Sequence, residues 1–205
     1  MKTWIRLACA AAALTMGVTA GVSAQVGKSQ GVADVNIAAE KDLAALPNMT
    51  PAIAKALVAK RPFASPTELN AFLLSQGLTA EQAMAFYQSA FVHINLNTAT
   101  SEEILLVPGA GRRMTREFAE YRPWKTWAQF DKEIGKYVGP EATAKLAQFT
   151  FISMNANSAS DADLMTVPGA TQSWVDMVKK SRPYKTKADL EKIAGKAHAR
   201  FFVVE

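Results

Sequence analysis

Hydrophobic residues recur at spacings of three and four along most of the chain, which is the period of an amphipathic helix. Met114, Phe118 and Tyr121 illustrate this spacing. Residues suited to cap a helix precede several of these stripes, as Thr100 does with Glu103 three residues later. No long stretch alternates between apolar and polar residues as a half-buried strand would. The pattern therefore predicts an all-α protein built of short helices.

The same arrangement of helix signals occurs three times, at intervals of 61 and 60 residues. In each copy an asparagine lies eleven residues before a proline, and an Arg-Pro-aromatic triplet begins fourteen residues after it. The matched residues are Asn36, Asn97 and Asn157, then Pro47, Pro108 and Pro168, then the triplets that begin at Arg61, Arg122 and Arg182. A repeat of this length indicates tandem copies of one structural unit. We therefore expect three small helical modules at residues 34–93, 94–153 and 154–205, the third truncated, joined by short extended linkers at 91–94 and 149–154.

The first 24 residues have the pattern of a secretory signal peptide. Lys2 and Arg6 precede a short apolar stretch, and Val22-Ser23-Ala24 is a small-residue cleavage site. The stretch is short and interrupted for a membrane span, so an uncleaved anchor is the weaker alternative. We expect a periplasmic or secreted protein with no stable membrane span after cleavage. Residues 25–33 are polar and predict a flexible lead-in.

Composition narrows the classes of function. Cys9 lies in the predicted signal, and His93 and His198 are the only histidines. The mature chain would therefore have no disulfide, no histidine–cysteine metal cluster and no catalytic triad with cysteine or serine. We expect no metal, no cofactor and no enzymatic activity. The net charge of +5 falls to +3 without the signal, which permits an anionic partner without requiring one.

One hairpin combines glycines with cations. In Val107-Pro108-Gly109-Ala110-Gly111-Arg112, the proline ends a helix and the glycines allow positive φ in a tight turn. The next helix would offer unpaired N–H groups and a positive dipole end to a phosphate. Arginines in its first turns oppose that dipole, which favours phosphate binding over the alternative of a solvated surface. The predicted contact residues here are Gly109, Ala110, Gly111, Arg112, Arg113 and Arg116.

A known family shares this sequence pattern. Asn95-Leu96-Asn97-Thr98-Ala99-Thr100-Ser101-Glu102-Glu103, followed by Val107-Pro108-Gly109-Ala110-Gly111, resembles the ComEA-type helix-hairpin-helix domain, a family that includes the exported DNA receptor of bacterial competence systems. The resemblance implies a compact module of two pseudo-symmetric hairpins that holds duplex DNA by its phosphates, without sequence preference. Residues 109–111 match the family's glycine-rich hairpin, and Arg112 and Arg113 match the basic residues that follow it. Degenerate modules of this family also serve as protein–protein scaffolds.

The other two hairpins depart from this pattern. In the first, Thr50 and Pro51 form a favourable helix start, and the threonine hydroxyl would compete for the N–H that a phosphate needs. The third keeps Gly169 but has Thr171 in place of the second glycine. Basic residues crowd the segment after it, and a DNA-facing and a solvated arrangement are equally open: Lys179, Lys180, Arg182, Lys185, Lys187 and Lys192. From this hairpin we include Gly169, Lys179 and Lys180 among the predicted contacts.

The aromatic residues around the Arg-Pro triplets have two interpretations. They are candidate stacking platforms for bases, yet their fixed positions after proline favour a place in the core: Phe63, Trp124, Trp127, Trp174 and Tyr184. Taken together, the sequence predicts an exported protein that binds double-stranded DNA non-specifically, with DNA uptake as a process it would serve. The alternative is a periplasmic or secreted scaffold that binds another exported protein, and the choice between DNA and RNA stays open.

Overall fold

The computed structural model of the protein describes residues 31–205. The predicted signal peptide and most of the predicted lead-in lie outside the described residues. The described part is mostly helical, with eleven helices and six two-residue strands. Within it, no helix combines the length and the apolar character needed to span a bilayer.

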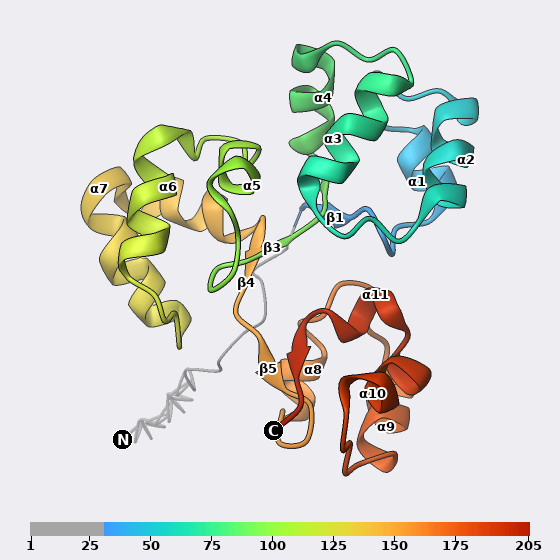
Figure 1. The fold of residues 1–205 in the computed structure, drawn as a ribbon, viewed down its shortest axis with the longest axis vertical. Coiled ribbons are helices and arrows are strands. Elements are labelled where there is room, and N and C mark those ends of the chain that lie inside the picture. Colours follow the sequence, from blue (N-terminus) through green and yellow to red (C-terminus); the bar gives the residue numbers. More distant parts are fainter. Residues whose placement is uncertain (1–30) are drawn as a thin grey trace, which may run out of the picture.

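The three sequence repeats follow one order of elements, and Figure 1 shows the helices in three groups with the strands between them. The first repeat has β1 (Ala33–Asp34), α1 (Glu40–Ala44), α2 (Pro51–Lys60), α3 (Pro66–Ser75), α4 (Ala80–Tyr87) and β2 (Ala90–Phe91). The second has β3 (Ile94–Asn95), α5 (Ser101–Leu105), α6 (Gly111–Glu120), α7 (Trp127–Ala147) and β4 (Thr150–Phe151). Here α7 corresponds to the last two helices of the other repeats, joined across a kink at the non-helical Gly139. The third has β5 (Met154–Asn155), α8 (Asp161–Leu164), α9 (Gln172–Lys180), α10 (Lys187–Ala194), α11 (Lys196–Ala199) and β6 (Phe202–Val203).

The strands correct the prediction of plain linkers at 91–94 and 149–154. Each repeat begins and ends with a strand, and the two pair in parallel: β1 with β2, β3 with β4, and β5 with β6. The strands are too short for an alternating pattern, and their partners lie more than forty residues away in the sequence. Local periodicity therefore gave no sign of the pairing.

The matched asparagines form hydrogen bonds that connect the beginning of each repeat to its Arg-Pro-aromatic triplet. The Asn36 side chain accepts the N–H of Phe63 at 2.8 Å and donates to the Phe63 carbonyl at 3.0 Å. Asn97 bonds Trp124, and Asn157 bonds Tyr184, in the same two-way manner. These bonds satisfy backbone groups that a loop would otherwise leave unpaired.

The arginines of the triplets also form hydrogen bonds to the beginning of their repeats. In each repeat, one guanidinium nitrogen donates to a backbone carbonyl that lies 23 residues earlier: Arg61 to Ala38, Arg122 to Ala99 and Arg182 to Ala159. The Arg-Pro peptide bond is cis at all three places. The most regular feature of the sequence repeat is therefore structural.

The aromatic residues of all three triplets lie in the core, as the sequence predicts, and so does most of the nearby aromatic surface. Phe63, Trp124, Trp127 and Tyr184 are buried, and Trp174 is half-buried beside His198. The first two repeats share one continuous hydrophobic core, in which the rings of Phe91 and Phe149 meet edge to face. The third repeat has a separate core.

A buried ionic cluster joins the third repeat to the first. His93 Nδ1 lies 2.8 Å from Asp34 Oδ2, and Arg200 Nη1 lies 3.3 Å from the same oxygen. Arg200 also donates to the carbonyl of His93. Burial alone would raise the pKa of Asp34, but the hydrogen bond and charge of His93 and the charge of Arg200 outweigh it, so the pKa of Asp34 lies below its ordinary value. The cluster holds chain segments more than one hundred residues apart.

Candidate nucleic-acid interface

The hairpin of the second repeat is a tight turn between α5 and α6. The N–H of Val107 donates to Ile104, and the N–H of Ala110 donates to Val107, both at 3.0 Å. Gly109 has a φ of 84° and Gly111 a φ of 59°, in the left-handed region that disfavours residues with a Cβ. A Cβ built on either glycine would meet no atom within 4 Å. The backbone conformation, and not crowding, therefore requires both glycines.

The helix that follows this turn begins without a side-chain cap. Ala110 stands at the N-cap of α6 and offers no side-chain acceptor, and its own side chain is buried. The N–H groups of residues 111–113 have no hydrogen-bond acceptor among the described residues. Gly111 and Arg112 are exposed at the same end. The positive end of the α6 dipole is thus open to an anion from solvent.

The three predicted arginines lie close together, but only one is unengaged. Arg112 is exposed and makes no ion pair with a described residue. Arg113 Nε lies 3.7 Å from Glu117 Oε1, and Arg116 Nη2 lies 3.2 Å from the same oxygen. The Arg113 and Arg116 side chains remain 56% and 72% exposed, while that of Glu117 is 3% exposed. One buried carboxylate therefore anchors two accessible cations.

Aromatic hydroxyls complete the surroundings of this carboxylate. The Arg113 guanidinium lies 4.3 Å from the centre of the Tyr137 ring, and the Tyr137 hydroxyl is 2.7 Å from that of Tyr121. Burial would raise the pKa of Glu117, but the hydrogen bonds from Arg116 and Tyr137 and the nearby charges lower it below its ordinary value. Glu117 is therefore ionised at neutral pH and holds the arginines by charge.

Sequence reasoning did not identify Glu117 and Tyr137 as part of this site. The pair Arg113–Glu117 has the i, i+4 spacing of a helix-surface ion pair, so that signal was available. Tyr137 comes from α7, and no local spacing links it to α6.

The equivalent hairpins of the first and third repeats begin their helices with caps. Thr50 Oγ1 accepts the N–H of Ile53, and Thr171 Oγ1 accepts the N–H of Trp174, both at 3.2 Å. The φ values of Thr50 and Thr171 are −113° and −124°, so both are extended where Gly111 is left-handed. The predicted caps are therefore present, and each engages the N–H that corresponds to that of Met114 in the second repeat.

The first turn position, in contrast, has the same backbone conformation in all three hairpins. Asn48 has a φ of 62° and Gly169 a φ of 73°, close to the 84° of Gly109. The three hairpins therefore share their first half and differ where the helix begins.

The third hairpin faces the first repeat. A Cβ on Gly169 would lie 2.5 Å from Ile37 Cγ2, and Ile37 packs against the core of the third repeat. Lys179 and Lys180 lie at the far end of the nine-residue helix α9, about 12 Å from the hairpin at 1.5 Å per residue. The structure does not bring the three predicted contacts of this repeat together.

Several cations of the third repeat have partners within the protein. Lys179 Nζ lies 2.5 Å from Asp161 Oδ1, and Arg182 donates to the Ala159 carbonyl. Lys187 donates to the carbonyls of residues 199 and 202. Lys180 is exposed and has no ion pair among the described residues. The lysine-rich segment thus offers less available charge than its sequence indicates.

No group of three or more histidine, cysteine, aspartate or glutamate side chains in residues 31–205 is arranged to hold a metal ion.

A scan against protein-family models, a search of curated proteins and a search of solved structures found no match for the chain.

Proposed function

We propose that the protein binds duplex DNA without sequence preference, and that the hairpin of the second repeat is the main contact. The observation that carries this proposal is the uncapped start of α6, where three unpaired N–H groups coincide with Arg112, Arg113 and Arg116. A DNA phosphate oxygen would accept the N–H groups of residues 111–113. Arg112 would contact the same phosphate or its neighbour, with Arg113 and Arg116 held by Glu117 beside it.

The proposal includes the organisation of the chain. We infer that residues 34–93, 94–153 and 154–205 are three tandem helix-hairpin-helix modules, of which the second binds DNA and the other two are scaffolding. The resemblance of residues 95–111 to the ComEA-type domain supports this assignment. The capped hairpins support the division of roles. The protein would have no catalytic activity of its own.

We also propose that residues 1–24 direct export and are removed after Ala24, which places the mature protein in the periplasm or outside the cell. N-terminal sequencing of protein recovered from those fractions should give Gln25. Protein that keeps Met1, or stays in the cytosol, would contradict the export proposal and leave DNA binding to be judged separately.

Fluorescence anisotropy with a labelled DNA duplex tests the binding proposal, using the full-length protein over a range of salt concentrations. Non-specific binding should have a dissociation constant of about 10⁻⁴ to 10⁻⁶ M at physiological salt. The affinity should fall steeply with salt, because phosphate binding releases counterions. A duplex RNA titrated in parallel decides which polymer is preferred.

Arg112→Ala and Lys180→Ala form a matched pair for this assay. Each removes one exposed cation that has no ion-pair partner among the described residues. Arg112→Ala should flatten the slope of log affinity against log salt by about 0.9, and Lys180→Ala should leave it unchanged. Equal effects would contradict the hairpin assignment. Salt-independent or absent DNA binding would favour the alternative of a protein-binding scaffold.

A further inference from the structure

A small cavity lies where the second repeat meets the third, and its volume is about 190 Å³. One side is the start of α7, with Thr126 and Trp127, and the other side includes β5 and the segment that leads to Asp163. Ile152 and Met154 add apolar surface to the lining. The cavity is separate from the hairpin of the second repeat, so a ligand here does not depend on DNA binding.

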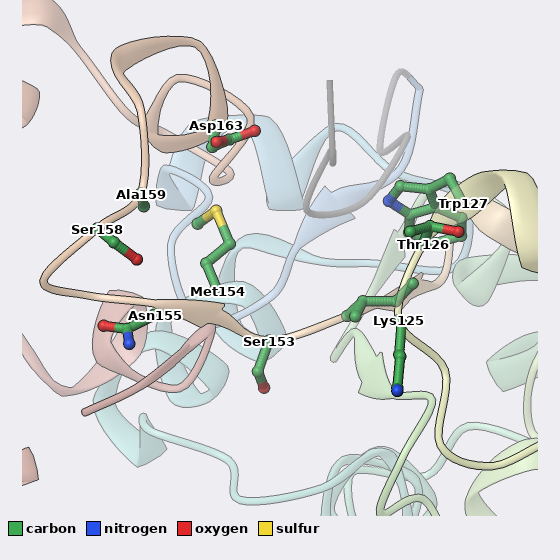
Figure 2. A pocket seen from close by; sticks show the side chains of 10 residues that line it. Lys125, Thr126, Trp127, Ser153, Met154, Asn155, Ser158, Ala159 and Asp163 are labelled. Atoms are coloured by element: carbon green, nitrogen blue, oxygen red, sulfur yellow. The ribbon is translucent and has the colours of Figure 1, made fainter. Parts of the chain in front are cut away.

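Two residues of the lining each have a buried polar atom that lacks a hydrogen-bond partner among the described residues. Trp127 is only 5% exposed, and its indole Nε1–H has no acceptor. Asp163 Oδ1 is also buried without a donor. Figure 2 shows the indole nitrogen turned towards the side of the cavity where Met154 and Asp163 lie. Buried donors and acceptors are costly to leave unpaired, so these atoms point to a ligand that pairs with both.

The corresponding cavity between the first and second repeats shows that the indole donor is not a requirement of the fold. That cavity has a volume of about 200 Å³. The side that corresponds to Trp127 in the other cavity is formed there by Ala64 and Pro66. Pro66 occupies the repeat position of Trp127 and has no N–H to donate. The second junction therefore has a recognition group that the first lacks.

The polar groups of the cavity favour a neutral ligand that both accepts and donates. The carboxylate of Asp163 disfavours an anion, and Figure 2 shows the Lys125 ammonium turned away from the indole nitrogen. A backbone amide meets the requirement, because its carbonyl accepts and its N–H donates.

The strand in the cavity wall also favours a peptide. β5 pairs with β6 on one edge only, among the described residues. The N–H groups of Met154 and Ala156 donate to the partner strand, so the N–H of Asn155 faces the other way. The Asn155 carbonyl on that edge already accepts the N–H of Ala159 at 2.9 Å, so the edge offers an extended peptide one donor, the N–H of Asn155.

We propose that this cavity binds an extended peptide segment, whose carbonyl accepts the Trp127 Nε1–H and whose N–H donates to Asp163 Oδ1. The partner would be a protein with an exposed extended segment of small, uncharged residues, because the cavity is small and no cation of the lining is turned into it.

Nuclear magnetic resonance of the full-length, ¹⁵N-labelled protein tests the proposal with an uncharged probe, N-acetyl-dialanine N-methylamide. The side-chain N–H signal of Trp127 is assigned by its loss in Trp127→Phe. Addition of the probe should shift this signal downfield and saturably, because the indole gains an acceptor. The variant serves only to assign the signal, and the binding measurement itself is made on the wild-type protein.

Two variants and a second ligand sharpen the test. Trp127→Phe should weaken probe binding about tenfold, as expected for one lost hydrogen bond. Trp174→Phe should bind as the wild type does, because the Trp174 indole already donates to the Ala194 carbonyl. An unmoved Trp127 signal, or equal affinity in Trp127→Phe, would overturn the proposal. An equal shift with sodium acetate would overturn the peptide assignment, because it would indicate an anion site.

Discussion

The hairpins of the second and third repeats share a proline, a positive-φ glycine and an alanine, yet their surroundings are opposite. The hairpin at Gly109 is open, and its helix begins without a cap. The hairpin at Gly169 lies against Ile37 of the first repeat, and Thr171 caps its helix. The same turn is therefore compatible with a ligand site and with a packing surface. The residue at the helix start and the neighbouring repeat make the difference.

The largest expected effect comes from the ionic cluster that joins the third repeat to the first. Arg200→Ala leaves the buried Asp34 with His93 as its remaining side-chain partner in this cluster. Removal of one member of a buried ion pair costs about 3–5 kcal/mol, and we expect the lower end of that range because His93 remains. Urea denaturation of Arg200→Ala against the wild type measures the loss. Lys180→Ala, which removes an exposed lysine, should stay within about 0.5 kcal/mol. If Arg200→Ala also lost no more than about 0.5 kcal/mol of unfolding free energy, this cluster would not be what holds the third repeat to the first.

The acid dependence of stability tests the same cluster without a large structural change. Because the pKa of folded Asp34 lies below its reference value of 3.8, its ionised form contributes stability above that pH. This contribution is lost as the pH falls through the lower folded value. The stability difference between the wild type and Asp34→Asn should therefore shrink below pH 3.8. Thermal unfolding at a series of pH values measures it, and a difference that persists in strong acid would contradict this account.

Alanine at the two matched glycines compares the open and the packed hairpin directly. Both positions have positive φ, so each substitution should cost about 1–2 kcal/mol in backbone strain. At Gly169 the new Cβ would also lie 2.5 Å from Ile37, which adds about 1–3 kcal/mol of overpacking. Gly169→Ala should therefore destabilise the protein more than Gly109→Ala in urea denaturation. Equal losses would mean that Ile37 yields easily and that the third hairpin is not a packing surface.

A threonine at Gly111 tests why the second hairpin lacks a cap. The variant Gly111→Thr has the residue that the first and third hairpins have, so its hydroxyl should accept the N–H of Met114, the position that Ile53 and Trp174 have in those hairpins. The hydroxyl would then occupy the helix start where the phosphate is proposed to bind, so DNA binding should weaken. From the sequence alone we expect little loss of stability, but Gly111 has a φ of 59°, and threonine there is strained by about 1–2 kcal/mol. Anisotropy and urea denaturation of the same variant separate the two effects. Unchanged DNA affinity would contradict the role of the uncapped helix start.

The sequence predicted the helical character and the caps at threonine, because both depend on residues close together in the chain. The repeats were visible because the same residues recur at fixed intervals. It did not predict the parallel strand pairs, which join segments at opposite ends of a repeat. It also did not predict the contacts of Gly169 with Ile37 and of Asp34 with Arg200, because each of them joins the first repeat to the third. In the candidate site, Arg112 is exposed as expected, whereas the anchoring of Arg113 depends on Tyr137 from another helix.

The smallest expected effect separates two adjacent arginines of the same hairpin. Arg112→Ala should flatten the salt slope of DNA binding by about 0.9 and leave stability within about 0.5 kcal/mol, because Arg112 has no ion pair among the described residues. Arg113→Ala should flatten the slope by a similar amount if Arg113 touches phosphate. It should also cost about 0.5–1 kcal/mol, because it removes the contact with the Tyr137 ring. Arg113→Lys keeps the charge but not the planar group over the ring, so it should restore most of the salt slope and little of the stability. Salt titrations and urea denaturation of the three variants measure both quantities. A variant pair in which Arg112→Ala destabilises the fold and Arg113→Ala does not would reverse the assignment of the free and the anchored arginine.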